Sequence, residues 1–464
     1  MMNVADQKER IDQLLIKKCS VVKVPGMALM VAKDGETIYK HFYGYRDVDR
    51  ELPVDQDTIF GVASITKSLA ALAVMQLEDA NKLSVDDPVI KWLPEFKTPK
   101  NQYRDDIKIK HFLSHTSGLP GMNAVNRARA LSKAKDPDGE YLSGKEAVAL
   151  SQEPVRNVVE LMNAMAETDY ELLGPPGTMF NYSNEGFAML QEIIERASGK
   201  PLIHYMKEHI FEPLGMTRSV FRTAELHTFD NVTELYAYTH GKTDVFHSPF
   251  WWDVSDIYTN GSLKTSATDL MRYLEVYRLG GTVNGEKIIS EASLKKMMTV
   301  PAVTPNGRGY GSGLQIDTHH GIDFIGHGGS IKGVSSHMKV IPKHGLTSVV
   351  LINLMEVDSE NLLMTALTEC LQMPMPDLTT LPSITLDDLH IYTGTYQSQE
   401  GEQLDITMEE DHLVMFTNHL QINLKPIERD RLITPSGDMI VFIRDDEDRI
   451  KGVFKGLRYI PKLT

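Results

Sequence analysis

Strand-like segments occur near both ends of the first 375 residues, and a long helical stretch separates them. The apolar segments 26–32 and 37–45 flank Asp34-Gly35, and Asp-Gly between two such segments is a strong β-hairpin signal. Further strand patterns occur at 309–316, 324–330, 335–341 and 346–354. Helical periodicity dominates between about 62 and 225. The order predicts an α/β domain in which one antiparallel sheet is interrupted by an inserted helical domain.

The character of the sequence changes after residue 375, where Pro376 and Pro382 mark a linker. Beyond the linker, seven or eight short alternating runs follow one another at close spacing, joined by polar turns. This spacing is typical of a small antiparallel β-barrel of the lipocalin-like type. We therefore expect two domains, a larger one at 1–375 and a C-terminal barrel at 376–464.

Charge and composition restrict the partners of the chain. It has 464 residues, with 48 Lys and Arg against 63 Asp and Glu, a net charge of −15. This balance argues against a nucleic acid or an anionic membrane as a partner. No stretch approaches the roughly 20 apolar residues of a membrane span, and the N-terminus as given lacks the apolar core of a signal peptide, which predicts a cytoplasmic location. Cys19 and Cys370 lack metal-ligand spacing and are interpreted as free thiols, so we expect no cofactor.

The segment Ser64-Ile65-Thr66-Lys67 lies where an apolar run gives way to a predicted helix. Residues three apart share a helix face, so Lys67 would lie beside the Ser64 hydroxyl. A serine hydroxyl becomes a good nucleophile when a base takes its proton, and a lysine kept neutral by burial can be that base. Four other Ser-x-x-Lys matches occur in the chain, but only Ser64 precedes a long apolar helix. We therefore interpret Ser64 as the candidate nucleophile.

A second polar motif, Tyr182-Ser183-Asn184, lies in a loop between turn-forming residues and a predicted helix, a usual place for catalytic side chains. A phenol beside an ammonium group can transfer a proton. Residues 258–260 repeat the Tyr-x-Asn pattern, and Tyr182 is also open to interpretation as a packed aromatic residue. Its flanking residues and its place after Ser64 favour Tyr182.

The third motif, His327-Gly328-Gly329, lies in a predicted strand, where the glycines leave room for a substrate backbone to pair. In this order, the three motifs resemble those of the serine β-lactamase and penicillin-binding protein superfamily over roughly residues 10–375. The resemblance is greatest to its class C-like branch, which includes D-alanyl-D-alanine carboxypeptidases, D-aminopeptidases, esterases and CubicO-type peptidases. Some of these enzymes carry an added barrel that borders the active site or builds an oligomer.

The resemblance implies a helical domain packed on an α/β domain, with the active site between them. It implies that Ser64 is acylated, that Lys67 is its proton partner and that Tyr182 is a general base or proton relay. The third motif would lie on an edge strand facing Ser64, and the N–H groups of Ser64 and Ser330 would form an oxyanion hole. The expected substrate-binding residues are Asn184, His327, Gly328, Gly329 and Ser330.

His327 replaces the lysine that β-lactamases carry in the third motif. Histidine is only partly charged near neutral pH, so it anchors a substrate carboxylate less well than lysine. The sequence therefore favours a serine hydrolase acting on small peptides, with D-residues, over a β-lactamase. The alternatives are a carboxylesterase on short acyl esters, a β-lactamase and a non-catalytic penicillin-recognising module. The resemblance is also compatible with a homo-oligomer.

Three further features have simpler interpretations. His115 lies in a loop of turn formers and is expected to stabilise that loop by hydrogen bonds. His319 and His320 have no third metal ligand at a suitable spacing, so a hairpin tip is the better interpretation. Trp251 and Trp252 fit a pocket wall and the hydrophobic core equally well.

Overall fold

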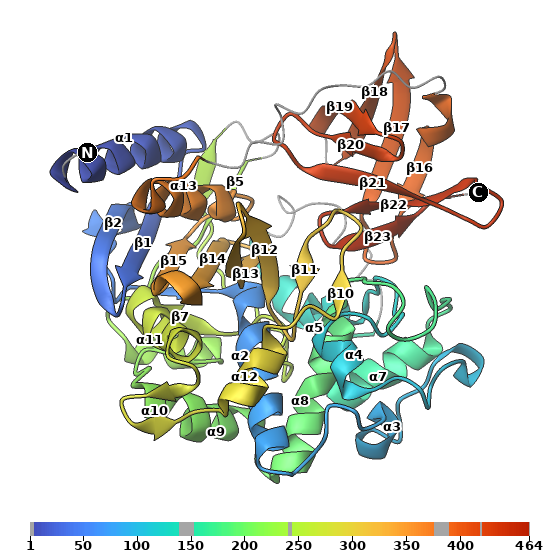
Figure 1. Cartoon of the computed structure of the whole chain (residues 1–464), viewed down its shortest axis with the longest axis horizontal. Helices are drawn as coiled ribbons and strands as arrows, with labels where there is room; N and C mark the ends of the chain where they lie inside the picture. Colours follow the sequence, from blue (N-terminus) through green and yellow to red (C-terminus); the bar gives the residue numbers. More distant parts are fainter. Residues whose placement is uncertain (1–3, 139–152, 240–243, 375–388, 418–419, 464) are drawn as a thin grey trace.

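One antiparallel sheet forms the centre of the first domain, and its strands come from both ends of that domain. The computed structural model describes residues 4–138, 153–239, 244–374, 389–417 and 420–463 (Figure 1). The nine strands lie in the order β10-β11-β12-β13-β14-β15-β1-β2-β3. In that order they are β10 Ala302–Val303, β11 Gly309–Tyr310, β12 Gln315–His319, β13 Ile322–Ile331, β14 Val334–Ile341, β15 Leu346–Ile352, β1 Gly26–Lys33, β2 Glu36–Asp47 and β3 Leu52–Pro53. The sheet therefore joins β15 to β1, which are more than 300 residues apart in sequence.

The predicted hairpin is confirmed as β1 and β2. Asp34 and Gly35 connect the two strands, with φ angles of 53° and 88°. Two successive residues in the left-handed region form the turn whose twist matches that of a two-strand ribbon, and Asp-Gly is a preferred sequence for it.

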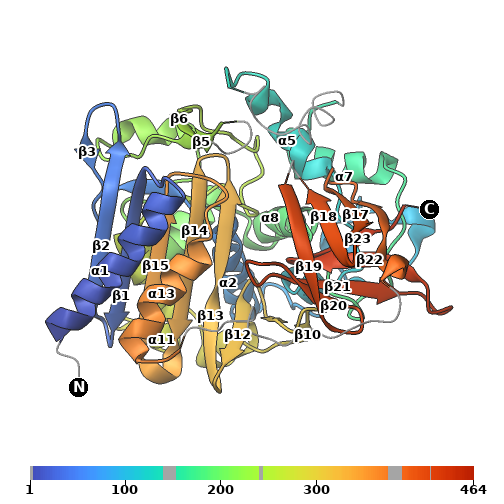
Figure 2. The same cartoon turned by 90° about the horizontal axis from the view of Figure 1, so that it is seen from above.

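Strand β1 is buried on both faces because helices cover both sides of the sheet. Met27, Leu29 and Val31 pack in a core with α1 (Val4–Val21) and α13 (Ser359–Leu371), which lie side by side (Figure 2). Ala28 and Met30 point the other way, into the core that contains α2 (Thr66–Asp79) and α11 (Ala267–Arg278). The alternation along the strand thus distributes successive side chains between two cores.

The inserted helical part packs around α2 and α8 (Asn184–Ser198). Helix α8 begins where the Ser183 hydroxyl accepts a hydrogen bond from the Gly186 N–H at 3.1 Å, and it ends at Gly199, whose φ is 72°. The other helices of this domain are α3 Val89–Trp92, α4 Ile109–Leu113, α5 Ala124–Lys133, α7 Val158–Glu167, α9 Leu202–Met206, α10 Glu212–Leu214 and α12 Glu291–Met297. Short two-stranded ladders join β4 Ile59–Gly61 to β7 Lys264–Ser266, β5 Tyr236–Tyr238 to β6 Val245–His247, and β8 Thr282–Val283 to β9 Glu286–Lys287.

The C-terminal strands form an eight-stranded antiparallel barrel in which sequential strands are neighbours. A bridge between Tyr396 and Lys462 brings its first and last strands together, so the barrel is nearly closed. Its strands are β16 Gly394–Gln397, β17 Gln403–Glu409, β18 His412–Thr417, β19 Leu420–Glu428, β20 Arg431–Ile433, β21 Met439–Arg444, β22 Ile450–Lys455 and β23 Arg458–Pro461. The predicted combination of an α/β domain, a helical insertion and an antiparallel barrel is confirmed. The predicted domain boundary at 375/376 lies outside the described residues.

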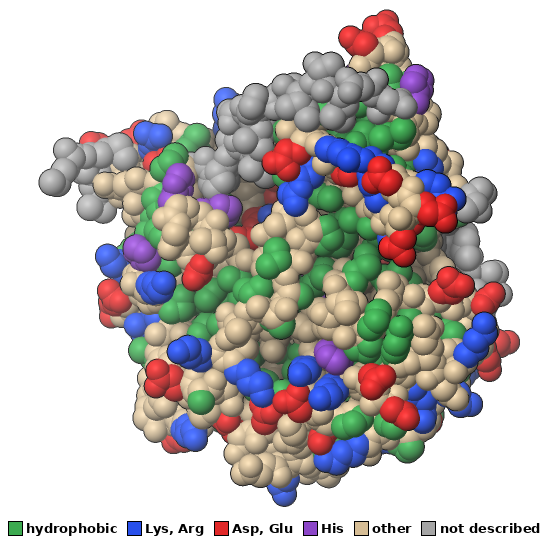
Figure 3. All heavy atoms as spheres, turned by 45° about the vertical axis from the view of Figure 1, so that its right-hand side comes forward, with side chains coloured by type: hydrophobic (Ala, Val, Ile, Leu, Met, Phe, Trp, Pro, Cys, Tyr) green, Lys and Arg blue, Asp and Glu red, His purple; other side chains and the backbone are tan. Residues whose placement is uncertain are grey.

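The barrel packs on the first domain through a shared apolar cluster. Phe180, Tyr182 and Tyr310 of the first domain meet Phe454 and Tyr459 of the barrel there. The face shown in Figure 3 carries acidic and basic side chains interspersed over both parts. Among the described residues, no helix combines the length and apolar character needed to cross a bilayer. Tyr182, a predicted active-site residue, therefore lies at the junction between the barrel and the first domain.

Candidate active site

Ser64 lies in a single 3₁₀ turn, Ala63–Ile65, that leads directly into α2. Ala63 has a φ of 45°, a conformation that costs energy for a residue with a side chain and that recurs at functional sites. One helical turn later, Lys67 is fully buried, and its Nζ lies 3.1 Å from the Ser64 Oγ. The spacing of three residues thus places amine and hydroxyl side by side, as predicted for a Ser-x-x-Lys motif entering a helix.

Burial decides the charge of the Lys67 amine. It lowers the pKa of Lys67 well below its usual range, and the nearby Arg458 and Arg129 lower it further. The amine also donates to the backbone carbonyl of Asn260 at 2.5 Å. A neutral amine can make that bond and still present its lone pair to the Ser64 O–H. The position of Lys67 and the direction of its pKa shift are both those that a general base needs.

Tyr182 lies beside Lys67, with the Lys67 Nζ 4.9 Å from the centroid of the Tyr182 ring. Burial raises the pKa of Tyr182 above its usual range, while contacts with the Ser64 hydroxyl and with Arg458 oppose that rise. The second tyrosine, Tyr258, instead donates to an Asp256 carboxylate oxygen at 2.7 Å. The structure thus brings Tyr182, rather than Tyr258, together with the serine and the lysine.

The third motif lies on β13. The prediction of an edge strand is wrong, because β13 pairs with β12 on one side and with β14 on the other. The ladder with β12 ends at Gly326, however, and residues 327–331 pair only with β14. The motif half of β13 therefore keeps one free edge even though the strand is internal to the sheet. A Cβ on Gly329 would lie 2.2 Å from the Val62 carbonyl oxygen and 2.9 Å from the Ser64 nitrogen. Only glycine lets this strand pass so close to the nucleophile, and Ser330 follows it as an exposed residue.

His327 belongs to a hydrogen-bonded chain whose proton positions are fixed from both ends. The Ser183 N–H, which can only donate, lies 3.0 Å from His115 Nδ1, and the Gly328 carbonyl, which can only accept, lies 2.5 Å from His327 Nδ1. The Tyr310 hydroxyl joins the two rings, at 3.2 Å from His115 Nε2 and 3.0 Å from His327 Nε2. His115 must therefore donate to Tyr310, and Tyr310 must donate to His327.

Both histidines of this chain are neutral. Burial lowers the pKa of His327 to about 3, and it lowers that of His115 well below its usual range. His115 thus makes the loop-stabilising bonds predicted for it, and these also link the Tyr182 motif to the third motif. Tyr310 was not predicted from the sequence, because a tyrosine in a two-residue strand has no pattern that marks it.

Asn184 is the first residue of α8 and is partly exposed beside Tyr182. The next residue, Glu185, is fully buried and was not predicted as part of the site. The Glu185 Oε1 accepts a hydrogen bond from the Val125 N–H at 3.2 Å. Burial raises the pKa of Glu185 to about 8, and the negative charge of Glu400 contributes to this rise. A protonated Glu185 avoids the cost of a buried charge next to Asn184.

The barrel contributes residues next to Tyr182 that were not predicted from the sequence. The Leu457 carbonyl accepts a hydrogen bond from the Tyr182 N–H at 3.0 Å. The Arg458 guanidinium lies 5.0 Å from the Tyr182 ring centroid and forms an ion pair with Glu400. The alternating pattern of a barrel strand shows which side chains face inward, but it does not show which turn contacts another domain.

A buried ion pair borders the site at the β13–β14 turn. The Lys332 Nζ and Asp136 Oδ2 are 2.6 Å apart, and neither side chain is exposed. Trp252 donates to the same Asp136 oxygen at 2.7 Å, while Trp251 packs in a small cluster with Ala63. The two tryptophans thus have different surroundings. Trp252 is nearly buried and bonds to the Lys332–Asp136 ion pair, whereas Trp251 packs beside the turn that contains Ser64.

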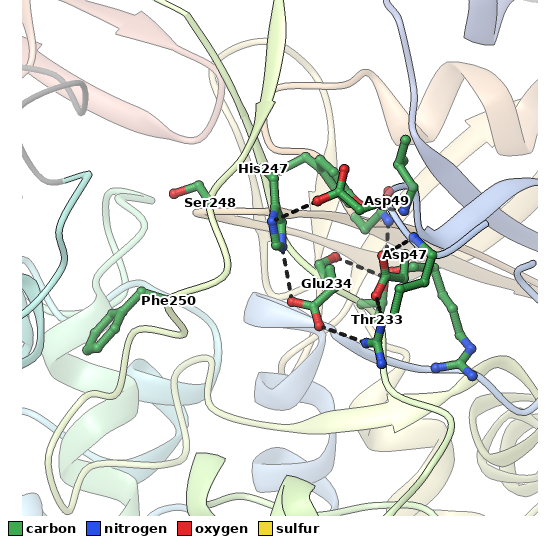
Figure 4. Close-up of polar contacts among 12 residues, drawn as sticks. Asp47, Asp49, Thr233, Glu234, His247, Ser248 and Phe250 are labelled. Carbon is green, nitrogen blue, oxygen red and sulfur yellow. Dashed lines mark hydrogen bonds and ion pairs between the residues drawn. The ribbon is translucent and has the colours of Figure 1, made fainter. Parts of the chain in front are cut away.

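Acidic and histidine side chains also lie together outside the candidate active site. His247 lies between Asp49 and Glu234, at 3.6 Å and 3.2 Å, on the surface where β6 approaches the β2–β3 connection (Figure 4). This cluster, like His319 and His320, lacks the ligand arrangement of a metal site. Within the described parts of the chain, no group of three or more His, Cys, Asp or Glu is placed to hold a metal ion.

Comparison with known proteins gives one family and several relatives. A family model described as Beta-lactamase matches residues 14–372. Protein flp of Staphylococcus aureus (strain MW2) is 25% identical over 352 residues, which cover 75% of this chain and 64% of that protein. The chain thus spans less than two thirds of the length of the curated relatives it matches first.

Two further matches extend through the barrel. Penicillin-binding protein 4* of Bacillus subtilis (strain 168) is 26% identical over 445 residues, which cover 91% of each chain. The solved structure of the octameric penicillin-binding protein homologue from Pyrococcus abyssi is 28% identical, has a TM-score of 0.71, and covers 97% of this chain and 99% of that one. The combination of the two domains is therefore shared with these relatives.

Proposed function

The chain belongs to the Beta-lactamase family, and we propose that it is a serine hydrolase that acts through an acyl-enzyme formed on Ser64. The observation that carries this proposal is the buried Lys67 amine, 3.1 Å from the Ser64 Oγ. An alcohol next to a neutral amine in a protein interior is an activated nucleophile. Ser64, Lys67 and Tyr182 are the proposed catalytic residues, and the order of the family motifs supports each assignment.

In the proposed acylation step, the Ser64 oxygen attacks the substrate carbonyl carbon while the Lys67 amine takes the serine proton. The N–H groups of Ser64 and Ser330 would hold the oxyanion that forms. Because burial keeps Tyr182 in its phenol form, it would donate its proton to the leaving group and regain one from Lys67. Water would then attack the acyl-enzyme, and the same groups would move the protons in the opposite direction.

We propose small peptides with D-residues as substrates, bound by Asn184, His327, Gly328, Gly329 and Ser330. The free edge of residues 327–331 supports a peptide, because an extended backbone can add to an unpaired strand. The D-configuration rests on the resemblance to D-alanyl-D-alanine carboxypeptidases and D-aminopeptidases alone. A neutral His327 offers no permanent charge for a carboxylate, which counts against β-lactams.

A carboxylesterase is the second candidate, because the site next to Ser64 lacks a lysine in the third motif and would tolerate uncharged acyl groups. The alternative of a non-catalytic module is less well supported, since it would not need a neutral amine beside a serine.

We also propose that residues 376–464 act as a separate barrel domain and that the protein forms a homo-oligomer, as the octameric relative from Pyrococcus abyssi does. Sedimentation velocity on the full chain tests the oligomer.

The function is tested by intact mass spectrometry after exposure to a fluorophosphonate. One adduct is expected on the wild type and none on Ser64→Ala, while metal chelators should have no effect. Turnover of a D-peptide, a penicillin and a short ester then ranks the substrates. Labelling that persists in Ser64→Ala would exclude Ser64 as the nucleophile.

The proton-transfer pair is tested by a double-mutant cycle. Lys67→Ala and Tyr182→Phe should each lower kcat by several orders of magnitude, and the double variant should lose less than the product, since the two act as a unit. Tyr258→Phe is the matched control and should keep its activity. Strictly multiplicative losses would show that Lys67 and Tyr182 work independently.

A further inference from the structure

The turn between β22 and β23 reaches from the barrel to the candidate relay tyrosine. The Leu457 carbonyl accepts from the Tyr182 N–H at 3.0 Å, and the Tyr459 N–H donates to the Asn181 Oδ1 at 2.9 Å. Arg458 lies between these two attachment points. These two hydrogen bonds therefore fix the position of the Arg458 backbone relative to Tyr182.

The Arg458 side chain places a permanent positive charge against the catalytic pair. Its guanidinium carbon is 5.0 Å from the Tyr182 ring centroid, and the Lys67 Nζ is 4.9 Å from the same centroid. The two basic groups are thus at most about 10 Å apart, and because only 27% of the Arg458 side chain is exposed, solvent screens their repulsion only in part. Arginine does not lose its proton, whereas a buried lysine can. Next to Arg458, Lys67 is the group that gives up its charge.

Glu400, also on the barrel, opposes this effect. It contacts the Arg458 guanidinium through both carboxylate oxygens, with the Nη2–Oε1 distance at 3.2 Å. The carboxylate lies against Gly121 of the first domain, where a Cβ would be only 2.8 Å from Oε2. The electrostatic influences on Lys67 and Tyr182 agree with this arrangement, because Arg458 lowers both pKa values and Glu400 raises both.

We propose that Arg458 is a positioning residue through which the barrel holds the Tyr182 ring and keeps Lys67 neutral, and that Glu400 moderates its charge. This inference rests on the proposed roles of Ser64, Lys67 and Tyr182. It assigns the barrel a direct part in proton transfer, in addition to any part in substrate access or assembly. Arg458 need not touch the substrate in this role.

The test is the pH dependence of Ser64 labelling by a fluorophosphonate, together with kcat/KM for p-nitrophenyl acetate, which carries no charge. Arg458→Gln should move the acidic limb of both profiles to higher pH by about one unit, because Lys67 is then protonated more easily. Glu400→Gln should move the limb in the opposite direction, to lower pH. Arg458→Lys and the double variant Arg458→Gln/Glu400→Gln should stay near the wild type, because each keeps the net charge.

The opposite signs distinguish this role from a structural one. Arg458→Gln and Glu400→Gln break the same ion pair, so a purely structural pair would change both variants in the same way. Arg444→Gln is the matched control, because Arg444 pairs with Asp430 at 2.8 Å elsewhere in the barrel and should leave the limb unchanged.

Several results would overturn the proposal. These are shifts of equal sign in the two variants, no shift in either, or a rise in KM limited to substrates that carry a carboxylate. The last result would make Arg458 a substrate anchor instead. Failure of the proposed function gives a different result, since the wild type would then show no labelling at Ser64 at any pH.

Discussion

Tyr310→Phe removes a single oxygen, and we expect it to destabilise the protein out of proportion to that change. The Tyr310 hydroxyl accepts from His115 and donates to His327, and all three side chains are buried. Without it, a donor and an acceptor both lose their partner, at about 1–3 kcal/mol each. The phenylalanine no longer has to bury a hydroxyl, which returns part of this cost. The expected loss in the free energy of unfolding is therefore about 2–4 kcal/mol.

Urea unfolding followed by tryptophan fluorescence measures this loss, with Tyr396→Phe as the control. Tyr396 is also fully buried, but its hydroxyl makes one bond, to the Tyr392 carbonyl at 2.7 Å. The control should cost only about 1 kcal/mol. If Tyr310→Phe costs no more than Tyr396→Phe, the hydroxyl does not bridge two histidines in the way the distances indicate.

Three further predictions concern the buried histidines, a buried ion pair and the glycine next to the nucleophile turn. Mild acid should destabilise the fold, because three buried histidines have pKa values below their unfolded value near 6.5: His115, His327 and His337. Their contribution to the free energy of unfolding is complete above pH 6.5 and falls by up to about 1.4 kcal/mol per histidine for each pH unit below it. Glu185 has a raised pKa, so it stabilises the fold as the pH falls from 8 to 4.5 and offsets part of this loss. Urea midpoints at pH 8, 6 and 5 measure the net change. Lys332→Met should cost about 3–5 kcal/mol by leaving Asp136 buried without its cation, and the double variant with Asp136→Leu should recover much of that loss in the same assay. Gly329→Ala should slow fluorophosphonate labelling at least about 100-fold, because its Cβ would displace the nucleophile turn, whereas Gly199→Ala, where a Cβ meets nothing, should label normally.

The sheet was predictable because its signals are local. Asp34-Gly35 requires a tight turn between two apolar segments, and this alone fixes the pairing of β1 with β2. The helix after Ser64 was predictable for a similar reason, since its apolar residues recur without glycine or proline. In both cases the information lies within about 15 residues, so no knowledge of the rest of the chain is needed.

The errors and omissions involve contacts between distant segments. The third motif was expected on an edge strand, but the ladder of β12 runs as far as Gly326, and nothing in the local pattern shows where a ladder ends. Tyr310 and Arg458 are more than 120 residues from Tyr182 in sequence, and neither belongs to a recognisable motif. Such residues join a site only through tertiary packing, which alternation and periodicity do not describe.

Burial is the main cause of the lowered pKa of Lys67, and the basic groups around it add to the effect. Arg458 and Arg129 keep their charge at every relevant pH, and both lower the pKa of Lys67. A protonated Lys67 would in turn disfavour the charged forms of His115 and His327, which stay neutral. Because the arginines do not lose their protons, the lysine and the histidines are the groups that stay uncharged. In the proposed mechanism the base at Ser64 is therefore produced by burial first and by neighbouring positive charge second, and one of the two arginines that supply this charge, Arg458, belongs to the barrel.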